Sequence, residues 1–486
     1  MYNTGHMNDV GKTIASALFL AAVVGCGTVR NAREVQARLV PMGSGQEAAE
    51  WVAPKVDLKG APLRALVEFA FTNRPSMTAA LIEVRDARLA LKEIAADAPL
   101  ASSTPWNAAD LSANMGYSES SDRAKLEDLG HTRKSRATGG LSLDVLIYDF
   151  GRNSARARAQ AEKVVAAEMA LVQQGYTVFA EVAGSYFSLL QNEALFEIAC
   201  TNELEYLEHL RQAEDKLSLG EAKELDVLKA RLDLSKSRQD IVSASNNVVT
   251  ARADLMAAMG IDASTGSAET VLGVRIGGLD RVLRALPDSA TGAEAAFDFA
   301  CTNAPAMQVA RARLRSASAD VDYAVANLMP SVSASLSLNW TDPLWYWRWG
   351  VDAVQSLFTG FRKTTAVDRA RVALESAAAA VAHEEQQLSK DLELAIAERD
   401  NAAEALRTAI VYVKQARENL ETVKAKYEVG DVSRVDFTDA VSEYTKALGE
   451  RIRAFYRGQV AEASLFRLLG LPPAYIEEQW ITEDLK

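Results

Sequence analysis

The sequence has little of what several protein classes require. Its 486 residues include only 27 glycines and 12 prolines, which excludes a collagen-like or low-complexity chain. Beyond a cysteine near the start, only Cys200 and Cys301 are present, and nothing in the sequence pairs them, so disulfides do not organise the fold. The net charge of −12 argues against a nucleic-acid partner, because phosphate binding requires a concentrated basic surface. No apolar run of 18 residues follows the first thirty residues, so no membrane-spanning helix is predicted.

Motifs for catalysis and for metal binding are also missing. Gly11-Lys12-Thr13 lacks the upstream glycine of a phosphate-binding loop, and Asp149-Phe150-Gly151 lacks the companion motifs of a kinase. His383-Glu384 has no second histidine at position 387, as a zinc protease would need. We therefore expect no enzyme, no catalytic residue, no metal and no cofactor other than a covalent lipid.

The start of the chain has the order of a secretory signal. Lys12 is followed by the apolar stretch 14–24 and then by Gly25-Cys26, which resembles a bacterial lipobox whose cysteine is acylated. This predicts a signal peptide over 1–25, lipidation at Cys26 and an N-terminal tether over 26–65. Gly27 after the cysteine favours the outer membrane in the pathway that this resembles. The alternative is an ordinary buried cysteine in an N-terminal helix.

An internal repeat organises the rest of the chain. Residues 69–77 match 299–307, and Lys216–Gly220 with Asp226 matches Lys426–Gly430 with Asp436. This predicts a first structural repeat over 66–260, a linker over 261–295, a second repeat over 296–470 and a tail over 471–486. Each repeat is expected to have a helix (66–98, 295–327), two strands, a long helical stretch and a last helix. About twenty extra residues in the first repeat predict an exposed loop over 118–136.

Four segments alternate between apolar and polar residues, as strands with one dry and one wet face do. They are about 110–118, 137–149, 331–340 and 349–358. Segments of this length suit transmembrane strands, and the tryptophans and tyrosine of 340–349 suit a membrane interface. Four strands cannot close a barrel in lipid, so the chain must oligomerise. Two copies would give eight strands and three would give twelve, and the strands alone do not choose between them. The alternative is a half-buried antiparallel sheet in a soluble protein.

The long helical stretches have a seven-residue apolar repeat, which predicts coiled-coil packing. The repeat runs through Ala157, Val164, Leu171 and Val178, and again through Val367, Leu374, Val381 and Leu388. Gly184-Ser185 weakens the middle of the first stretch, so we predict two antiparallel helices of roughly 50 Å with a turn there. The second stretch should turn between Glu393 and Asp400. Gly220 and Gly430 are predicted structural helix breaks. The alternative is a soluble coiled-coil scaffold.

The order of these elements, with three further motifs, is similar to that of the outer-membrane efflux (TolC-like) family. The motifs are Tyr148-Asp-Phe-Gly151, Leu357-Phe-Thr-Gly360 and Lys426-Tyr-Glu-Val-Gly430, and the likeness covers 66–472, with a cysteine start typical of the lipoprotein branch. The resemblance implies a mainly α fold with a small β part, in which a homotrimer completes a 12-stranded barrel and a 12-helix periplasmic tunnel. It further implies the exit duct of a tripartite efflux or type I secretion system. The implied partners are a periplasmic adaptor, an inner-membrane pump and outer-membrane lipid.

In the resembled family, acidic side chains often narrow the periplasmic tip. Glu393, Glu398 and Asp400 are the candidates for a pore constriction here, whereas the corresponding first-repeat segment, 182–190, contains no acid. The alternative for these three acids is a solvated helix face. For the whole chain, the alternative function is a non-channel periplasmic coiled-coil scaffold or adaptor lipoprotein.

Overall fold

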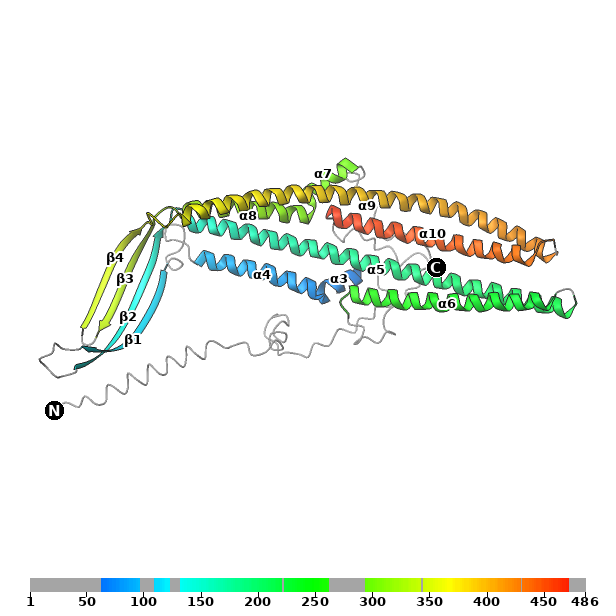
Figure 1. The fold of residues 1–486 in the computed structure, drawn as a ribbon, viewed down its shortest axis with the longest axis horizontal. Helices are drawn as coiled ribbons and strands as arrows, with labels where there is room; N and C mark the ends of the chain where they lie inside the picture. Colours follow the sequence, from blue (N-terminus) through cyan, green and yellow to red (C-terminus); the bar gives the residue numbers. More distant parts are fainter. Residues whose placement is uncertain are drawn as a thin grey trace, which may run out of the picture. The chain divides into compact units, whose positions relative to one another are not determined.

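Two helical hairpins and one four-stranded sheet dominate the described part of the chain (Figure 1). The structure is a computed structural model, and it describes residues 63–96, 109–122, 132–220, 223–261, 293–341, 344–429 and 431–471. All of them belong to one compact unit, 58–486. The predicted signal peptide, and most of the tether, linker and tail, lie outside the described residues.

The two repeats have the same order of elements. The first consists of α3 (Leu63–Asn73), α4 (Pro75–Ala96), β1 (Ala109–Asp122), β2 (Thr132–Tyr148), α5 (Arg152–Ser218) and α6 (Glu224–Ala258). The second consists of α7 (Ala293–Asn303), α8 (Pro305–Ala326), β3 (Ser331–Thr341), β4 (Leu344–Val354), α9 (Arg362–Glu428) and α10 (Arg434–Leu469).

The first helix of each repeat is broken, where a single helix was expected over 66–98 and 295–327. The breaks fall at Arg74 and Ala304, each followed by a proline that starts the next helix. Ala304 has φ −60° and ψ 124°, an extended conformation. A proline disfavours the helical conformation in the residue before it and is well suited to the first position of a helix, which explains both breaks.

The long helical stretches do not turn in their middle. α5 and α9 are each continuous over 67 residues, about 100 Å of helix, so the predicted turns at Gly184-Ser185 and over 393–400 are wrong. The residues on both sides of Gly184 are buried, including Ala183 and Tyr186. Glycine in a helix costs up to about 1 kcal/mol, whereas burying one large apolar side chain contributes about 2 kcal/mol, so packing keeps the helix intact.

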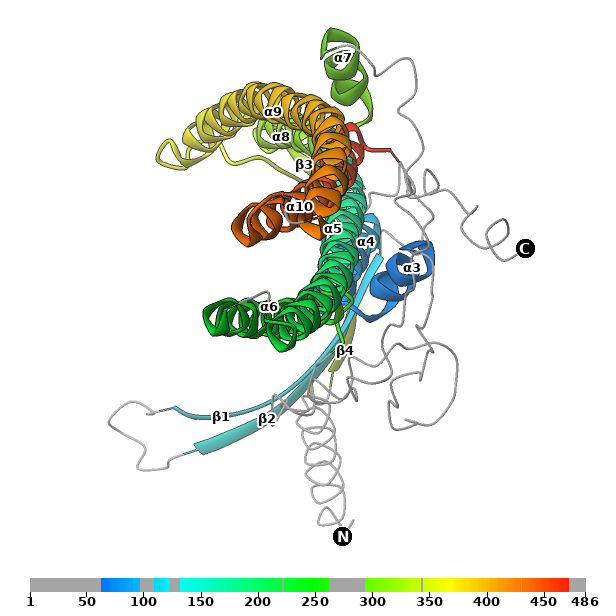
Figure 2. The same ribbon diagram turned by 90° about the vertical axis from the view of Figure 1, so that its right-hand side faces the viewer.

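The helices pack side by side at two levels. Nearer the sheet, contacts run α4 to α5 to α8 to α9, and nearer the hairpin turns they run α6 to α5 to α10 to α9. Each level is therefore a row of four helices, and Figure 2 shows the row as an arc. All eight residues of the seven-residue repeats are buried or half-buried. The coiled-coil interpretation of these positions is confirmed.

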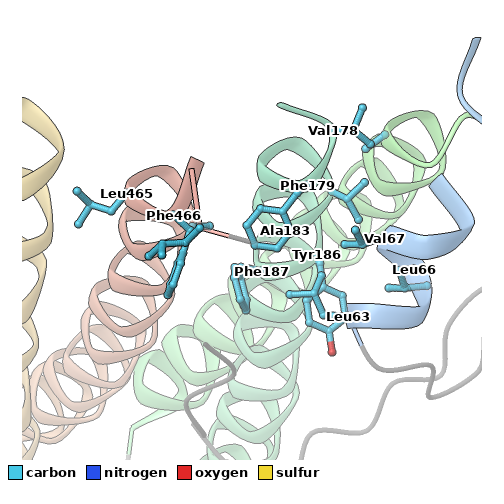
Figure 3. Close-up of a cluster of buried hydrophobic side chains, with 14 of the residues drawn as sticks. Leu63, Leu66, Val67, Val178, Phe179, Ala183, Tyr186, Phe187, Leu465 and Phe466 are labelled. Atoms are coloured by element: carbon cyan, nitrogen blue, oxygen red, sulfur yellow. The ribbon is translucent and has the colours of Figure 1, made fainter. Parts of the chain in front are cut away.

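The main hydrophobic core lies about midway along α5 and takes its buried side chains from α3, α5, α6, α7, α8, α9 and α10. In Figure 3, Leu63, Leu66 and Val67 of α3 point toward a stripe of α5 side chains. The α5 stripe includes Phe179 and Phe187. Phe466 of α10, in the second repeat, belongs to the same buried cluster. The core thus joins the two repeats at the level where the predicted turn was placed.

The sheet is antiparallel with the order β1-β2-β3-β4, and the β2–β3 pairing joins the two repeats. Its first hairpin is longer than predicted, because pairing continues through polar residues to Asp122 opposite Thr132. Strand pairing uses backbone groups and does not require apolar side chains. β4 covers 344–354 and not 349–358, so Trp345 and Trp347 belong to the strand, as Trp349 does, and not to the loop before it.

Candidate functional site: the two-faced sheet and the helical turns

One face of the sheet is apolar across all four strands. In the strand register, Leu111, Leu143, Leu336 and Trp349 form one cross-strand row, and Leu141, Leu338 and Trp347 belong to the next. These side chains are not covered within the chain: Leu111 is 70% exposed and Trp349 is 68% exposed. A contiguous exposed apolar face of this size marks an interaction with lipid or with another protein.

The opposite face of the sheet carries small polar and charged side chains. One row contains Ser112, Ser142, Ser337 and Arg348, and the hydroxyl oxygens of Ser112 and Ser142 are 2.6 Å apart. In the neighbouring row Asp110 lies directly opposite Asp144. Like charges at opposed positions repel each other, so this arrangement suits a wet surface where water screens them.

Both edges of the sheet are open in the single chain. Within the described residues, β1 pairs only with β2, and β4 pairs only with β3. Each edge therefore presents unpaired backbone N–H and C=O groups, which are a template for a further strand. Next to an apolar face, such edges need a partner chain if lipid surrounds the sheet.

The helical hairpins turn at the far ends of α5 and α9. After α5, Gly220 has φ +80°, a left-handed conformation that ends the helix, as expected for this residue. Gly430, its equivalent, lies outside the described residues. α10 begins with a capping box in which the backbone N–H of Asp436 donates to the Ser433 hydroxyl and the Asp436 carboxylate accepts from the backbone N–H of Ser433. The Ser433 hydroxyl also donates to the Asp436 carboxylate over 2.7 Å, and this bond, followed by the one from the Ser433 backbone N–H, lowers the pKa of Asp436 below its usual value.

Near the turns, an aromatic cluster that the sequence analysis missed joins the two hairpins. His209 of α5 is 2% exposed and its ring centroid lies 5.5 Å from that of Tyr427 and 5.2 Å from that of Phe437. Lys216 places its ammonium 4.6 Å from the Tyr427 ring. Arg434 of α10 and Asp233 of α6 form an ion pair of 2.6 Å beside the cluster. Tyr427 and Phe437 occupy the places of Leu217 and Val227 in the first repeat, a substitution of aromatic for aliphatic residues that was visible in the sequence.

The three acids proposed for a tip constriction do not lie at a turn. Glu393, Glu398 and Asp400 are exposed and lie within the continuous helix α9, at the level of the main core. The Arg399 side chain donates to the Asp400 carboxylate over 2.7 Å, which reduces its effective charge. Their assignment to the tip was wrong because the helix does not turn there, and the hairpin turn is instead near 429–433.

The predicted lipidation residue, Cys26, lies outside the described residues. In the part of the chain that the structure describes, no group of three or more potential metal ligands is found. Across those same residues, none of the helices combines the length and the apolar character needed to cross a bilayer.

The sequence matches a known protein family in both repeats. The family described as outer membrane efflux protein matches residues 69–261 and 298–471, which cover both repeats. The chain belongs to this family. No curated protein sequence matches this chain.

Solved structures share the fold. The CmeC outer membrane channel of Campylobacter jejuni superposes with a TM-score of 0.71 at 15% identity. The match covers 91% of the present chain and 92% of the CmeC chain. The MtrE channel of Neisseria gonorrhoeae, solved in an open state, gives 0.68 at 19% identity over 87% and 93%. The outer membrane protein VceC of Vibrio cholerae gives 0.69 at 16% identity over 84% and 96%. These likenesses establish the fold, which is mainly helical with one small antiparallel sheet.

Family membership also bears on function and location. The efflux protein is an outer-membrane channel component that serves as an exit duct of efflux systems. The alternative of a non-channel scaffold or adaptor is not favoured. The family and the similar structures are described as membrane channels and not as enzymes.

Proposed function

We propose that three copies of this chain form one passive duct from the periplasm to the exterior, without a catalytic step. The observation that supports this proposal most directly is the sheet with one apolar face, one polar face and two open edges. β4 of one chain would pair with β1 of the next, which closes twelve strands with the apolar face toward lipid. The polar face, with Ser112 and Asp144, then lines a wet bore.

The helices support the same assembly. At both levels the chain contributes a row of four helices, so three copies supply twelve. The row is curved, and within the described residues no further helix continues it beyond its two ends (Figure 2). Three such arcs placed end to end would surround a tunnel that continues the bore of the barrel.

The proposed partners are a periplasmic adaptor and an inner-membrane pump, which would dock at the helical turns. The exposed apolar side chains beside these turns, Leu219 and Val429, suit a protein partner. A covalent lipid on Cys26 would add an anchor, which contributes only modest affinity beside a closed barrel. The motif Gly25-Cys26 supports this part of the proposal.

The test of the duct is the mass and conductance of the detergent-solubilised full chain. We expect the mass of three chains and stable single-channel currents after reconstitution into phospholipid bilayers. A monomer, or a dimer without measurable conductance, contradicts the proposal. Lipidation is tested separately by radiolabelled palmitate, which should label the wild type and not Cys26→Ser, whose hydroxyl cannot form the thioether. Equal labelling of both would overturn the anchor and leave the duct untouched.

A further inference from the structure

The two strand-to-helix junctions leave the same end of the sheet. The last residue of β2, Tyr148, lies opposite Val332, and the last residue of β4, Val354, lies opposite Ser331. Residues 149–151 then connect β2 to the long helix α5, and residues 355–361 connect β4 to the long helix α9 (Figure 1). The two junctions are therefore at one level, between the sheet and the helices.

A phenylalanine with a left-handed backbone lies in each junction. Phe150 has φ +53° and Phe361 has φ +64°, and these are the only two non-glycine residues with positive φ in the described part of the chain. A left-handed conformation costs an L-residue about 1–2 kcal/mol. Strain of this kind is retained where the position of the side chain matters for function.

Neither of the two strained phenylalanines is fully buried: Phe150 is 45% exposed and Phe361 is 71% exposed. Beside Phe361, Leu357 and Phe358 are 91% and 76% exposed. Phe358 and Phe361 contact each other edge to face with centroids 5.7 Å apart, and Phe150 contacts Tyr148 in the same way at 4.8 Å. Because Tyr148 lies in the register of the apolar face, Phe150 extends that face toward the helices.

Cations follow each aromatic group. Arg152 begins α5, and Arg362 and Lys363 begin α9, while neither helix has an acid in its first turn. The helix dipole disfavours cations at this end, so helix stability does not explain them. The acid closest in sequence to Arg152 is Asp149, which is buried and whose carboxylate accepts from the backbone N–H groups of Gly151 and Asn153. The Arg362 Nε donates to the Thr359 carbonyl over 3.4 Å, and among the described residues no ion pair is formed by Arg152, Arg362 or Lys363, so their charge is open to an external anion.

We propose that these junctions form a collar that binds anionic glycerophospholipid headgroups of the inner leaflet. The collar consists of Phe150, Arg152, Phe358, Phe361, Arg362 and Lys363. The inference rests on the proposed outer-membrane duct, because that places the junctions where the lipid-facing sheet meets the periplasmic helices. The aromatic rings enter the acyl boundary, and the long basic side chains reach the headgroup phosphates.

The position of the collar distinguishes lipid from a neighbouring subunit. β2 is an inner strand, with β1 and β3 on its two sides, so its junction does not border an open edge of the sheet. The same pairing of an exposed aromatic residue with a cation occurs there and beside the edge strand β4. A feature repeated at inner and edge positions faces a medium that surrounds the whole barrel.

The experiment compares two variants with equal loss of charge. The collar variant is Arg152→Gln/Arg362→Gln/Lys363→Gln. The control variant is Lys229→Gln/Lys236→Gln/Lys414→Gln, which removes three exposed cations from α6 and from the far part of α9. Native mass spectrometry of the detergent-solubilised full chain counts dioleoylphosphatidylglycerol and dioleoylphosphatidylcholine bound from an equimolar mixture. A third variant, Arg152→Lys/Arg362→Lys/Lys363→Arg, keeps the charge and checks that folding is not the cause.

We expect the wild type, the control and the charge-keeping variant to prefer phosphatidylglycerol, and the collar variant to lose this preference. Each removed cation should lower the preference about fivefold. Equal binding of the two lipids by the wild type, or an equal loss in the control, overturns the collar. Dissociation of the assembly in the collar variant also overturns it, since the junctions would then be subunit contacts. Failure of the duct itself is distinguishable, because the wild type would then neither insert into vesicles nor conduct.

Discussion

Gly470 lies against the main chain of Asn303, so that a Cβ atom on Gly470 would be 2.8 Å from the Asn303 carbonyl oxygen. Gly470 follows α10 with φ +67°, and Asn303 is the last residue of α7. In the first repeat, Gly260 with φ +77° lies in the same way against Arg74, which follows α3. In both repeats, the end of the last helix therefore packs against the break before a proline.

The first prediction concerns this contact. Gly470→Ala should lower the free energy of unfolding by about 1–3 kcal/mol, because a left-handed backbone disfavours alanine and the added methyl group meets a carbonyl oxygen. Urea unfolding of the reconstituted protein, followed by circular dichroism, measures the loss. An unchanged midpoint would mean that the α7–α10 contact is not formed as described.

The second prediction concerns the continuity of α5. Gly184→Ala should leave stability unchanged or raise it by up to about 1 kcal/mol, since alanine favours a helix and a Cβ atom there meets no atom within 4 Å. It is also the matched control for Gly470→Ala, because both changes add one methyl group to a glycine. A clear loss of stability in the same urea assay would restore the turn first expected at Gly184-Ser185.

The third prediction concerns the two faces of the sheet. Leu336→Lys places a charge in the middle of the apolar face, beside Leu143 and Trp349, and should destabilise the inserted protein by about 2–4 kcal/mol. Ser335→Lys changes the next residue, which lies on the polar face opposite Asp144, and should be close to neutral. Folding yields in phospholipid vesicles measure both. Similar yields for the two variants would contradict the assignment of one face to lipid.

The fourth prediction concerns pH and the aromatic cluster. Burial, and then the positive charge of Arg434, lower the pKa of His209 below its usual value. A lowered pKa in the folded state means that this contribution to stability is complete above about pH 6.5 and is lost as the pH falls through the lowered value. Protonation would place a charge against the stacked rings of Tyr427 and Phe437. Lys216 and Arg434 lie nearby, and Asp233, Glu205 and Glu208 are the facing acids.

Hydrogen–deuterium exchange tests this expectation. After correction for intrinsic exchange, amides of 205–216 and 424–437 should exchange faster at pH 5 than at pH 7.5. The substitution His209→Phe should remove the difference, because an uncharged ring then fills the site. His383→Gln, which changes an exposed histidine of α9, should keep it. A pH effect that survives in His209→Phe would assign the titration to another group.

Some features of the protein were determined by the sequence alone. Strict alternation in 331–340 predicts two faces because successive side chains of a strand point to opposite sides, and the register confirms the faces. The internal repeat predicts the same order of helices and strands in both halves, because similar sequences have similar local preferences, and the structure has this order. Gly220 predicts a helix end because glycine adopts a left-handed conformation without strain.

Other features were decided only by the tertiary structure. Local preference at Gly184-Ser185 favours a break, but burial of Ala183 and Tyr186 against neighbouring helices outweighs it, so α5 runs on to a turn at Gly220. Glu393, Glu398 and Asp400 lie away from the hairpin turn because α9, like α5, is continuous, and not because of their own chemistry. His209 meets Tyr427 and Phe437 only because two hairpins from different repeats pack together. Contacts between segments more than 200 residues apart depend on how the helices pack, and no local pattern in the sequence contains that information.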